Sequence, residues 1–354
     1  MKVSRLAAGA MALIVPATVC FTGCSWSPFN SFSYTYENAD KYTAGDREID
    51  DTVTKINIDY VSGDVKVKGT DTDSISVKET ANKDLDSDHQ VHTWVDGDTL
   101  YVRYCVSTNM INFGKIEKSL EITIPSAQEL DDFIIDVSSG NIDLDGFTTD
   151  NLNSHASSGN MTIDCSASVI ELKSSSGNVG LTQTGNSDSV KIKASSGNVA
   201  LIHDGDSDSI TIDSSSGKIN VEQKGTVKNV KIHSSSGGAY AKMGVVDTFA
   251  IDVSSGGIVI DAEDIRNLST KASSGHSEIS LGKVPETSSL DCSSGGIDVR
   301  IPEDADVTVH VDISSGEFNY DLPFEKNGKD YIGGNGTADM KIHCSSGNVN
   351  FNKI

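Results

Sequence analysis

The sequence has 354 residues, of which 51 are acidic and 28 basic, and its formal net charge at pH 7 is -23. Such a charge argues against binding to nucleic acid or to an anionic lipid surface, because both need a positive protein face. Apolar residues make up 36% of the chain and there are only 6 prolines. The composition therefore permits a folded core and argues against a disordered stalk, but it indicates no activity.

The N-terminus has the pattern of an export signal. Two basic residues precede a mostly apolar run over 6–21, which is too short to span a bilayer comfortably. The run ends in Phe21-Thr22-Gly23-Cys24, which resembles the lipobox of bacterial lipoproteins, although that motif usually has leucine where Phe21 stands. We therefore predict a signal peptide over 1–23 and a lipidated Cys24 that anchors the protein to the outer face of the cell membrane. An ordinary secretory peptide cut elsewhere is the alternative.

The next two segments lead into the repetitive part of the chain. Residues 24–50 are polar and aperiodic, and we interpret them as a lipidated tether. Residues 51–130 are predicted to form an N-terminal cap. The cap would contain a degenerate first coil around Val61-Ser62-Gly63, a hairpin over 94–101 that turns at an Asp-Gly pair, and a strand ending at Pro125.

One tripeptide, Ser-Ser-Gly, dominates the chain from residue 131 onward. It occurs at intervals of 18 to 21 residues, with one interval of 31 before the last copy. Apolar residues alternate with polar ones on both sides of each glycine, as at Ile192 before Gly197 and at Val199 and Leu201 after it. The glycines are Gly140, Gly159, Gly177, Gly197, Gly217, Gly237, Gly256, Gly275, Gly295, Gly316 and Gly347. Alternation with period two is typical of strands that bury one face.

This repetition predicts an all-β fold, a parallel β-solenoid (β-helix) of about 20-residue coils. Each coil would hold two short strands joined at the Ser-Ser-Gly turn and would advance by one strand spacing, ~4.8 Å. A sandwich or a barrel would also alternate, but neither needs the same tripeptide in every repeat. We expect regular coils over 131–316, then an insertion and a C-terminal closing coil over 317–354.

The turn explains the choice of residues in the motif. A corner between strands needs a residue with φ > 0, which glycine adopts without steric cost, so the glycines are predicted to be structural turn residues. Serine hydroxyls stacked from coil to coil are expected to satisfy one another and the backbone of the corner. Cys292 and Cys344 stand three residues before a glycine and are interpreted as inward packing residues. Counted along the sequence they are two coils apart, at least ~9.6 Å, which exceeds disulfide reach.

These features together resemble the DUF4097 adhesin-type domain of bacterial surface proteins, over about residues 50–354. The resemblance rests on Ser62-Gly63-Asp64-Val65-Lys66-Val67, on Leu120-Glu121-Ile122-Thr123-Ile124-Pro125, on the repeated unit, and on the closing Ser346-Gly347-Asn348-Val349. It implies a non-catalytic surface β-solenoid and supplies no catalytic residues.

Two polar motifs are candidate binding sites. In four consecutive coils an asparagine follows the corner glycine: Asn141, Asn160, Asn178 and Asn198. They predict an amide ladder that caps the turn, with an outward glycan-facing ladder as the alternative. Asp204-Gly205-Asp206-Ser207-Asp208 resembles a calcium loop but lacks the distal glutamate, so we interpret it as an acidic turn. No metal, cofactor or catalytic residue is predicted.

Three functions are compatible with the sequence. The first is a lipid-anchored, non-catalytic surface protein that acts as an adhesin or binding scaffold for a glycan, a host-matrix protein or an envelope protein. The second is an envelope partner protein in cell-envelope stress signalling, as the resemblance suggests. The third is a carbohydrate-active enzyme on a β-helix, which would need a groove that gathers two carboxylates, or a carboxylate and a base.

Overall fold

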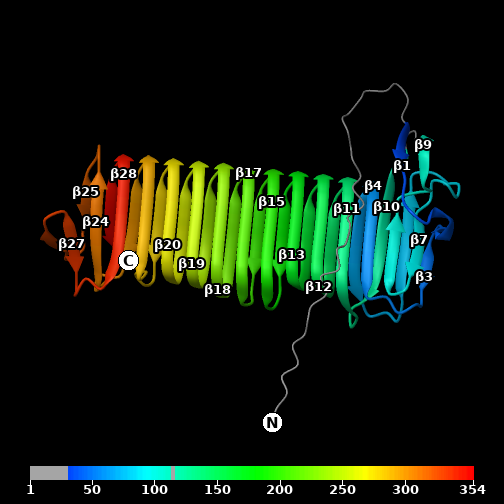
Figure 1. The fold of residues 1–354 in the computed structure, drawn as a ribbon, viewed down its shortest axis with the longest axis horizontal. Coiled ribbons are helices and arrows are strands. Elements are labelled where there is room, and N and C mark those ends of the chain that lie inside the picture. Colours follow the sequence, from blue (N-terminus) through cyan, green and yellow to red (C-terminus); the bar gives the residue numbers. More distant parts are fainter. Residues whose placement is uncertain (1–30, 113–115) are drawn as a thin grey trace, which may run out of the picture.

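The computed structural model describes residues 31–112 and 116–354, and it is a β-solenoid (Figure 1). Its coils stand side by side in one long row between an N-terminal cap and a C-terminal hairpin. Within the described residues, no helix has the length and apolarity needed to cross a membrane. The predicted signal peptide and Cys24 lie outside the described residues.

The strands fall into three groups. The cap contains β1 (Ser31–Tyr34), η1 (Ala39–Lys41), β2 (Thr43–Ala44), β3 (Arg47–Ile49), β4 (Lys55–Ser62), β5 (Asp64–Thr70), β6 (Ile75–Ala81), β7 (His92–Asp96), β8 (Thr99–Arg103), β9 (Thr108–Asn112) and β10 (Lys118–Pro125). The coils that follow contain β11 (Glu129–Ser139), β12 (Ile142–Ser158), β13 (Met161–Ser176), β14 (Val179–Gln183), β15 (Ser187–Ser196), β16 (Val199–His203), β17 (Ser207–Ser216), β18 (Ile219–Ser236), β19 (Ala239–Ser255), β20 (Ile258–Ser274), β21 (Ser277–Leu281), β22 (Thr287–Ser294) and β23 (Ile297–Ile301). The last part contains β24 (Val307–Ile313), β25 (Phe318–Tyr320), β26 (Glu325–Asn327), β27 (Asp330–Gly333), β28 (Ala338–Ser346) and β29 (Val349–Lys353).

Each coil contributes to two faces of the solenoid. The segment before the Ser-Ser-Gly corner belongs to face one and the segment after it to face two. On both faces neighbouring coils pair in parallel, for example β13 with β15 and β16 with β18. The predicted parallel solenoid is therefore confirmed. At the opposite corner β12, β13, β18, β19 and β20 run through without a break, so several coils contain one bent strand rather than two short ones.

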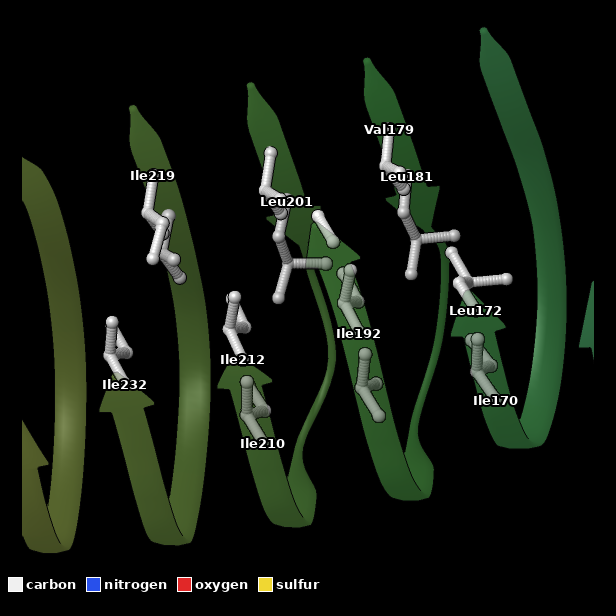
Figure 2. Packing of buried hydrophobic residues seen from close by; sticks show 14 of the residues in the cluster. Ile170, Leu172, Val179, Leu181, Ile192, Leu201, Ile210, Ile212, Ile219 and Ile232 are labelled. Atoms are coloured by element: carbon white, nitrogen blue, oxygen red, sulfur yellow. The ribbon is translucent and has the colours of Figure 1, made fainter. Parts of the chain in front are cut away.

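The core is a ladder of branched aliphatic side chains. Ile192, Ile212 and Ile232 are register partners in three successive coils, and all three are buried (Figure 2). After the corner, Val199 and Leu201 continue the ladder on face two. The inward side chains of every coil are buried against those of the next coil, and this burial supplies the main hydrophobic stabilisation of the fold.

The corner glycines are required for two reasons. Their φ angles lie between +111° and +147°, a region that residues with a Cβ rarely adopt. In addition, a Cβ on Gly197 would lie 2.1 Å from the carbonyl oxygen of Gly177 in the neighbouring coil. The corner amides use backbone acceptors: the Gly177 N–H donates to the carbonyl of Ser196 at 3.2 Å. These amides are therefore satisfied by backbone carbonyls of the neighbouring coil and not by the stacked serine hydroxyls that the sequence led us to expect.

We predict that Gly197→Ala lowers the free energy of unfolding by about 1–3 kcal/mol, through backbone strain and the clash with Gly177. Gly185→Ala is the matched control, because Gly185 also has a positive φ of +84° but its Cβ would lie 3.5 Å from the nearest atom, the Ser166 Oγ. The control should lose less stability. Urea denaturation of the two variants measures the difference, and equal losses would show that close approach of the coils is unimportant.

The predicted tether over 24–50 is wrong for residues 31–50. There β2 pairs with β7 and β3 pairs with β6, both antiparallel, and the side chains of Tyr34 and Ile49 are buried. These segments belong to the cap. Their strands are two to four residues long, which is too short to show a readable period in the sequence.

The cap ends the parallel stack on both faces. On face one β8 pairs in parallel with β4 and antiparallel with β7. On face two β10 pairs in parallel with β5 and antiparallel with β6. The first coil, β4 and β5, itself pairs with β11 and β12. Antiparallel outer strands cannot serve as the in-register parallel template that another coil would need, so they block end-to-end growth.

The prediction that the C-terminal coil closes the end of the solenoid is also wrong. β28 pairs with β22 on one side and with β24 on the other, and β29 likewise lies between β23 and β25. In Figure 1 the red strand β28 accordingly stands inside the row, beside the orange β24. The outermost coil is the one with Gly316, covered by the hairpin of β26 and β27, because β27 pairs antiparallel with β24. Cys292 and Cys344 are therefore in adjacent coils, not two coils apart.

Candidate functional site

The asparagine ladder caps the turns along one corner. The Oδ1 atom of Asn141 accepts a hydrogen bond from the backbone N–H of Asn160 at 3.0 Å. In the same way the Oδ1 of Asn160 accepts from the Asn178 N–H, and the Oδ1 of Asn178 from the Asn198 N–H, both at 2.9 Å. The Asn178 side chain also donates to Asn160 at 3.1 Å. The amide oxygens are thus engaged within the protein, while the side chains remain exposed along the edge of face two.

The acidic turn over 204–208 does not gather its carboxylates around one point. Asp204 and Asp208 pair with Lys224 and Lys228 of the next coil at 2.8 and 2.5 Å. A carboxylate oxygen of Asp206 accepts the backbone N–H of Thr226, also in the next coil, at 2.7 Å. Across the described ranges no group of three or more histidine, cysteine or acidic residues is placed to hold a metal ion. The arrangement is that of a turn neutralised by its neighbour.

Part of the outer surface of face two carries no charge in the central coils, although Glu222 and Lys242 pair beside it on the same strands. On face one Glu171 bridges Lys173 and Lys191 at 3.1 and 3.3 Å. On face two a group of neighbouring outward positions carries no charge, and we call it the neutral window. It consists of Thr162, Gly180, Thr182, Ala200, Ile202, Asn220, Tyr240 and Val259. Ile202 and Tyr240 are each 40% exposed, unusually high for large apolar side chains in this protein.

A cavity of about 330 Å³ opens on face one at the C-terminal end. Its lining comes from β22, β24, β28 and the β26–β27 hairpin: Ser289, Asp291, His310, Val311, Asp312, Lys329, Asp330, Lys341, Ile342 and His343. His310 lies 2.7 Å from Asp330 through Nδ1 and 3.1 Å from Asp339 through Nε2. His343 lies 3.3 Å from Asp312.

The sequence did not reveal this grouping of carboxylates and imidazoles. Asp291, His343 and Asp312 become neighbours only because the last coil inserts between two earlier ones. His310 and Asp330 meet only through the antiparallel pairing of β24 with β27. The long insertion was the available signal, since it alone interrupts the regular spacing of the repeat.

A serine–histidine pair inside the solenoid is structural. The Nε2 atom of His203 is 2.8 Å from the Ser187 Oγ, and its Nδ1 lies 3.0 Å from the Gly205 carbonyl. His203 is fully buried, and this burial lowers the pKa of the imidazole. Gln183 and Gln223 occupy the same inward column in the neighbouring coils. The pair fills the corner opposite Ser-Ser-Gly in these coils with hydrogen-bonded side chains. Because both side chains are buried, they present no nucleophile to solvent.

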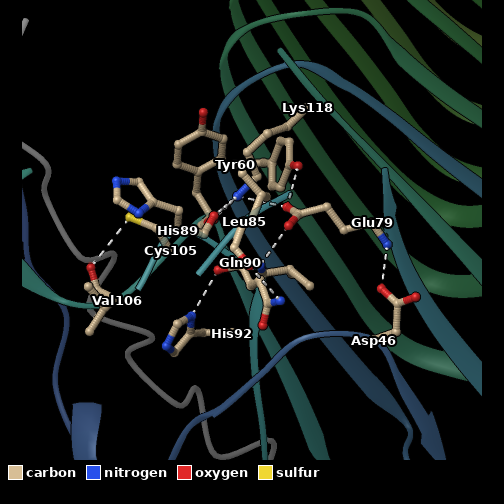
Figure 3. A network of polar contacts seen from close by, with 12 residues as sticks. Asp46, Tyr60, Glu79, Leu85, His89, Gln90, His92, Cys105, Val106 and Lys118 are labelled. Atoms are coloured by element: carbon tan, nitrogen blue, oxygen red, sulfur yellow. Dashed lines mark hydrogen bonds and ion pairs between the residues drawn. The ribbon is translucent and has the colours of Figure 1, made fainter. Parts of the chain in front are cut away.

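The cap contains a buried ion pair (Figure 3). The Lys118 Nζ lies 2.7 Å from a Glu79 carboxylate oxygen, and the two side chains are 0% and 4% exposed. Tyr60 donates its hydroxyl to the same carboxylate at 2.9 Å, and the Val91 N–H donates to the other oxygen at 2.9 Å. Lys118 also donates to the Tyr104 carbonyl at 2.6 Å. Burial lowers the pKa of Lys118, and the charge of Glu79 opposes that effect. With every partner inside the cap, the network holds the cap together.

Comparison with solved structures found proteins of low sequence identity that align with most of this chain. A solved structure of a candidate adhesin from Parabacteroides distasonis is 15% identical, with a TM-score of 0.40 over 89% of this chain and 97% of that chain. A candidate adhesin from Bacteroides fragilis is 12% identical, with a TM-score of 0.27 over 89% and 97% of the two chains. A candidate cell adhesion protein from Clostridium sporogenes is 8% identical, with a TM-score of 0.18 over 89% and 100%.

The family assignment rests on a sequence model rather than on these structures. No curated protein matches the sequence. The family model described as Toastrack DUF4097 matches residues 53–240 and again 182–352, and the overlap of the two matches is expected for a repeat. Since the matches together span nearly all of the described residues, this chain belongs to the Toastrack DUF4097 family.

Proposed function

We propose that the protein is a lipid-anchored, non-catalytic surface protein that acts as an adhesin or binding scaffold. The observation that carries the proposal is the neutral window on face two, in a chain whose formal net charge is -23. A protein with this charge repels anionic ligands over most of its surface. The uncharged window is the part of the central coils suited to a neutral ligand.

The chemistry of the window favours a neutral glycan. Tyr240 offers an exposed aromatic ring to the apolar face of a sugar. Asn220 on the adjacent coil and Thr182 two coils beyond Asn220 offer hydrogen-bonding groups. Asn178 and Asn198 lie two residues before the window positions Gly180 and Ala200, and their exposed amides would extend the contact. Successive coils present their window positions ~4.8 Å apart, so a chain molecule could contact several coils at once.

A glycan and host-matrix binding array tests this function, and Tyr240→Ala tests the surface. We expect wild-type protein to bind neutral glycans and Tyr240→Ala to bind them at least about tenfold more weakly, a loss of ~1.4 kcal/mol. Tyr320→Ala is the matched control, since Tyr320 is 42% exposed but lies at the end of the solenoid. Equal losses in both variants, or selective binding to anionic glycans, would refute the assignment to the window.

The anchor is tested separately. Cys24→Ala should abolish incorporation of a palmitate analogue and release the protein from the membrane fraction, because a lipid on Cys24 is the proposed attachment. Continued labelling or membrane retention of this variant would rule out the lipoprotein assignment. The array and this experiment are independent, so binding can be upheld even where the anchor fails.

A carbohydrate-active enzyme is the second candidate, and the cavity on face one is the observation that favours it. Asp291 and Asp312 flank His343 on neighbouring strands, so their Cα atoms are two strand spacings, ~9.6 Å, apart. A carboxylate beside an imidazole is also a usual general-base pair. Release of reducing ends from a polysaccharide panel, lost in Asp312→Asn, would support this function. An unreactive wild-type protein would exclude it for the polysaccharides tested.

A further inference from the structure

Two thiols face one another across neighbouring coils. Cys292 on β22 and Cys344 on β28 are register partners, and they are 1% and 0% exposed. In-register parallel strands place such Cα atoms ~4.8 Å apart, within the range of about 4.4–6.8 Å that disulfides require. Both residues are free thiols in this structure.

Cysteine is unusual at this position of the repeat. The same inward slot, three residues before the corner glycine, holds alanine or serine in most regular coils: Ala156, Ser174, Ala194, Ser214, Ser234 and Ala272. Small size alone therefore does not require cysteine. The slot contains cysteine in two coils, and the out-of-order insertion of β28 makes these two coils spatial neighbours. The remaining described cysteines, Cys105 and Cys165, lie in the cap and on β13, away from the pair.

We propose that Cys292 and Cys344 form a disulfide that fixes the inserted coil in the exported protein. The inference rests on the export part of the proposed function, because disulfides persist in oxidising compartments. The oxidant is a protein or small-molecule disulfide. One cysteine thiolate attacks a sulfur of that disulfide to give a mixed disulfide, and the second thiolate displaces the oxidant. The new S–S bond forms at the expense of the oxidant's bond. The two electrons and two protons leave on the oxidant, as a dithiol from a protein disulfide or as two thiols from a small-molecule disulfide.

Burial determines when this bond forms. Burial raises the pKa of the Cys292 thiol to about 11, with a further contribution from Cys344, and it also raises the pKa of Cys344. Thiolate, the reactive form, is therefore scarce once the coil is seated. The exchange takes place before β28 docks between β22 and β24. The bond then closes the loop over 292–344, which contains the outermost coil and the hairpin of β26 and β27.

The test combines thiol mapping with thermal unfolding. Full-length protein is expressed with its leader, alkylated at harvest and digested without reduction. Mass spectrometry should show the Cys292 and Cys344 peptides joined, with the loss of two hydrogens. Dithiothreitol should lower the Tm of the wild-type protein by several degrees. The double variant Cys292→Ala and Cys344→Ala should show no such shift, and Cys165→Ala should respond like the wild type.

A second experiment tests whether the two thiols can form the bond at all, independently of whether the protein is exported. Reduced protein is unfolded and refolded in oxidised glutathione, where the same link should form in the wild type. Free alkylated Cys292 and Cys344 after this refolding would overturn the assignment of the pair. A link that forms in glutathione but is absent from cell-derived protein would overturn the claim for the exported molecule, without bearing on glycan binding by the neutral window.

Discussion

Replacing Ile212 with alanine is expected to lower the free energy of unfolding by about 2–5 kcal/mol. The Ile212 side chain is fully buried and packs between Ile192 and Ile232 in the coils on either side (Figure 2). The backbone hydrogen bonds between coils hold the strands at a fixed spacing, so the surroundings cannot collapse into the space that alanine leaves. The loss therefore includes a cavity as well as the lost burial.

Asp213→Ala is the matched control for Ile212→Ala. Asp213 is the next residue on the same strand, points outward and is partly exposed. Its replacement should change stability by less than about 0.5 kcal/mol, as at most solvated positions. Urea denaturation of both variants provides the comparison. If Asp213→Ala were as destabilising as Ile212→Ala, the inward and outward faces of this strand would be reversed.

Lys118→Met is expected to cost about 3–5 kcal/mol, because it leaves the Glu79 carboxylate buried without its counter-charge. The Tyr60 hydroxyl (Figure 3) and the Val91 N–H would then remain as hydrogen-bond donors to that carboxylate. Methionine has nearly the length of lysine, so the change removes the charge with little loss of packing. Hydrogen exchange at the amides of β10, together with urea denaturation, would localise the loss to the cap.

Two further variants distinguish a buried ion pair from a merely tight contact. The double variant Glu79→Leu and Lys118→Met removes both charges and should recover much of the stability lost by Lys118→Met alone. Lys224→Met breaks the exposed pair with Asp204 and should leave unfolding almost unchanged. A double variant no more stable than Lys118→Met would show that shape and hydrogen bonding, rather than the unpaired charge, dominate the cap.

Because the sequence repeats, the solenoid could be predicted from local patterns. Alternation around Gly197 identified Ile192, Val199 and Leu201 as inward residues, and all three are buried. The corner glycines were assigned from the motif, because a positive φ is a property of a single residue. The structure adds the approach of 2.1 Å between a Gly197 Cβ and the neighbouring coil, which depends on how coils stack.

Other features depended on which coil lies beside which. The coils have nearly the same pattern, so any coil can pair in register with any other, and their order along the chain need not be their order in space. The insertion over 320–340 lets the chain return, and β28 enters between β22 and β24. The pairing of Cys292 with Cys344 follows from that order, as does the His343 cavity. The contact between Glu79 and Lys118 likewise arises only where the cap strands meet.

The sequence alone thus determined the parallel solenoid, its inward and outward residues and the glycine corners, because each depends on local periodicity or on the conformation of one residue. Only the tertiary structure decided the order of the last coils, the role of residues 31–50, the carboxylate–imidazole cavity and the neutral window. The physical reason is that these features arise from pairing between distant segments. Closure of the insertion and antiparallel pairing at the two ends select one arrangement among coils whose local patterns are nearly equivalent.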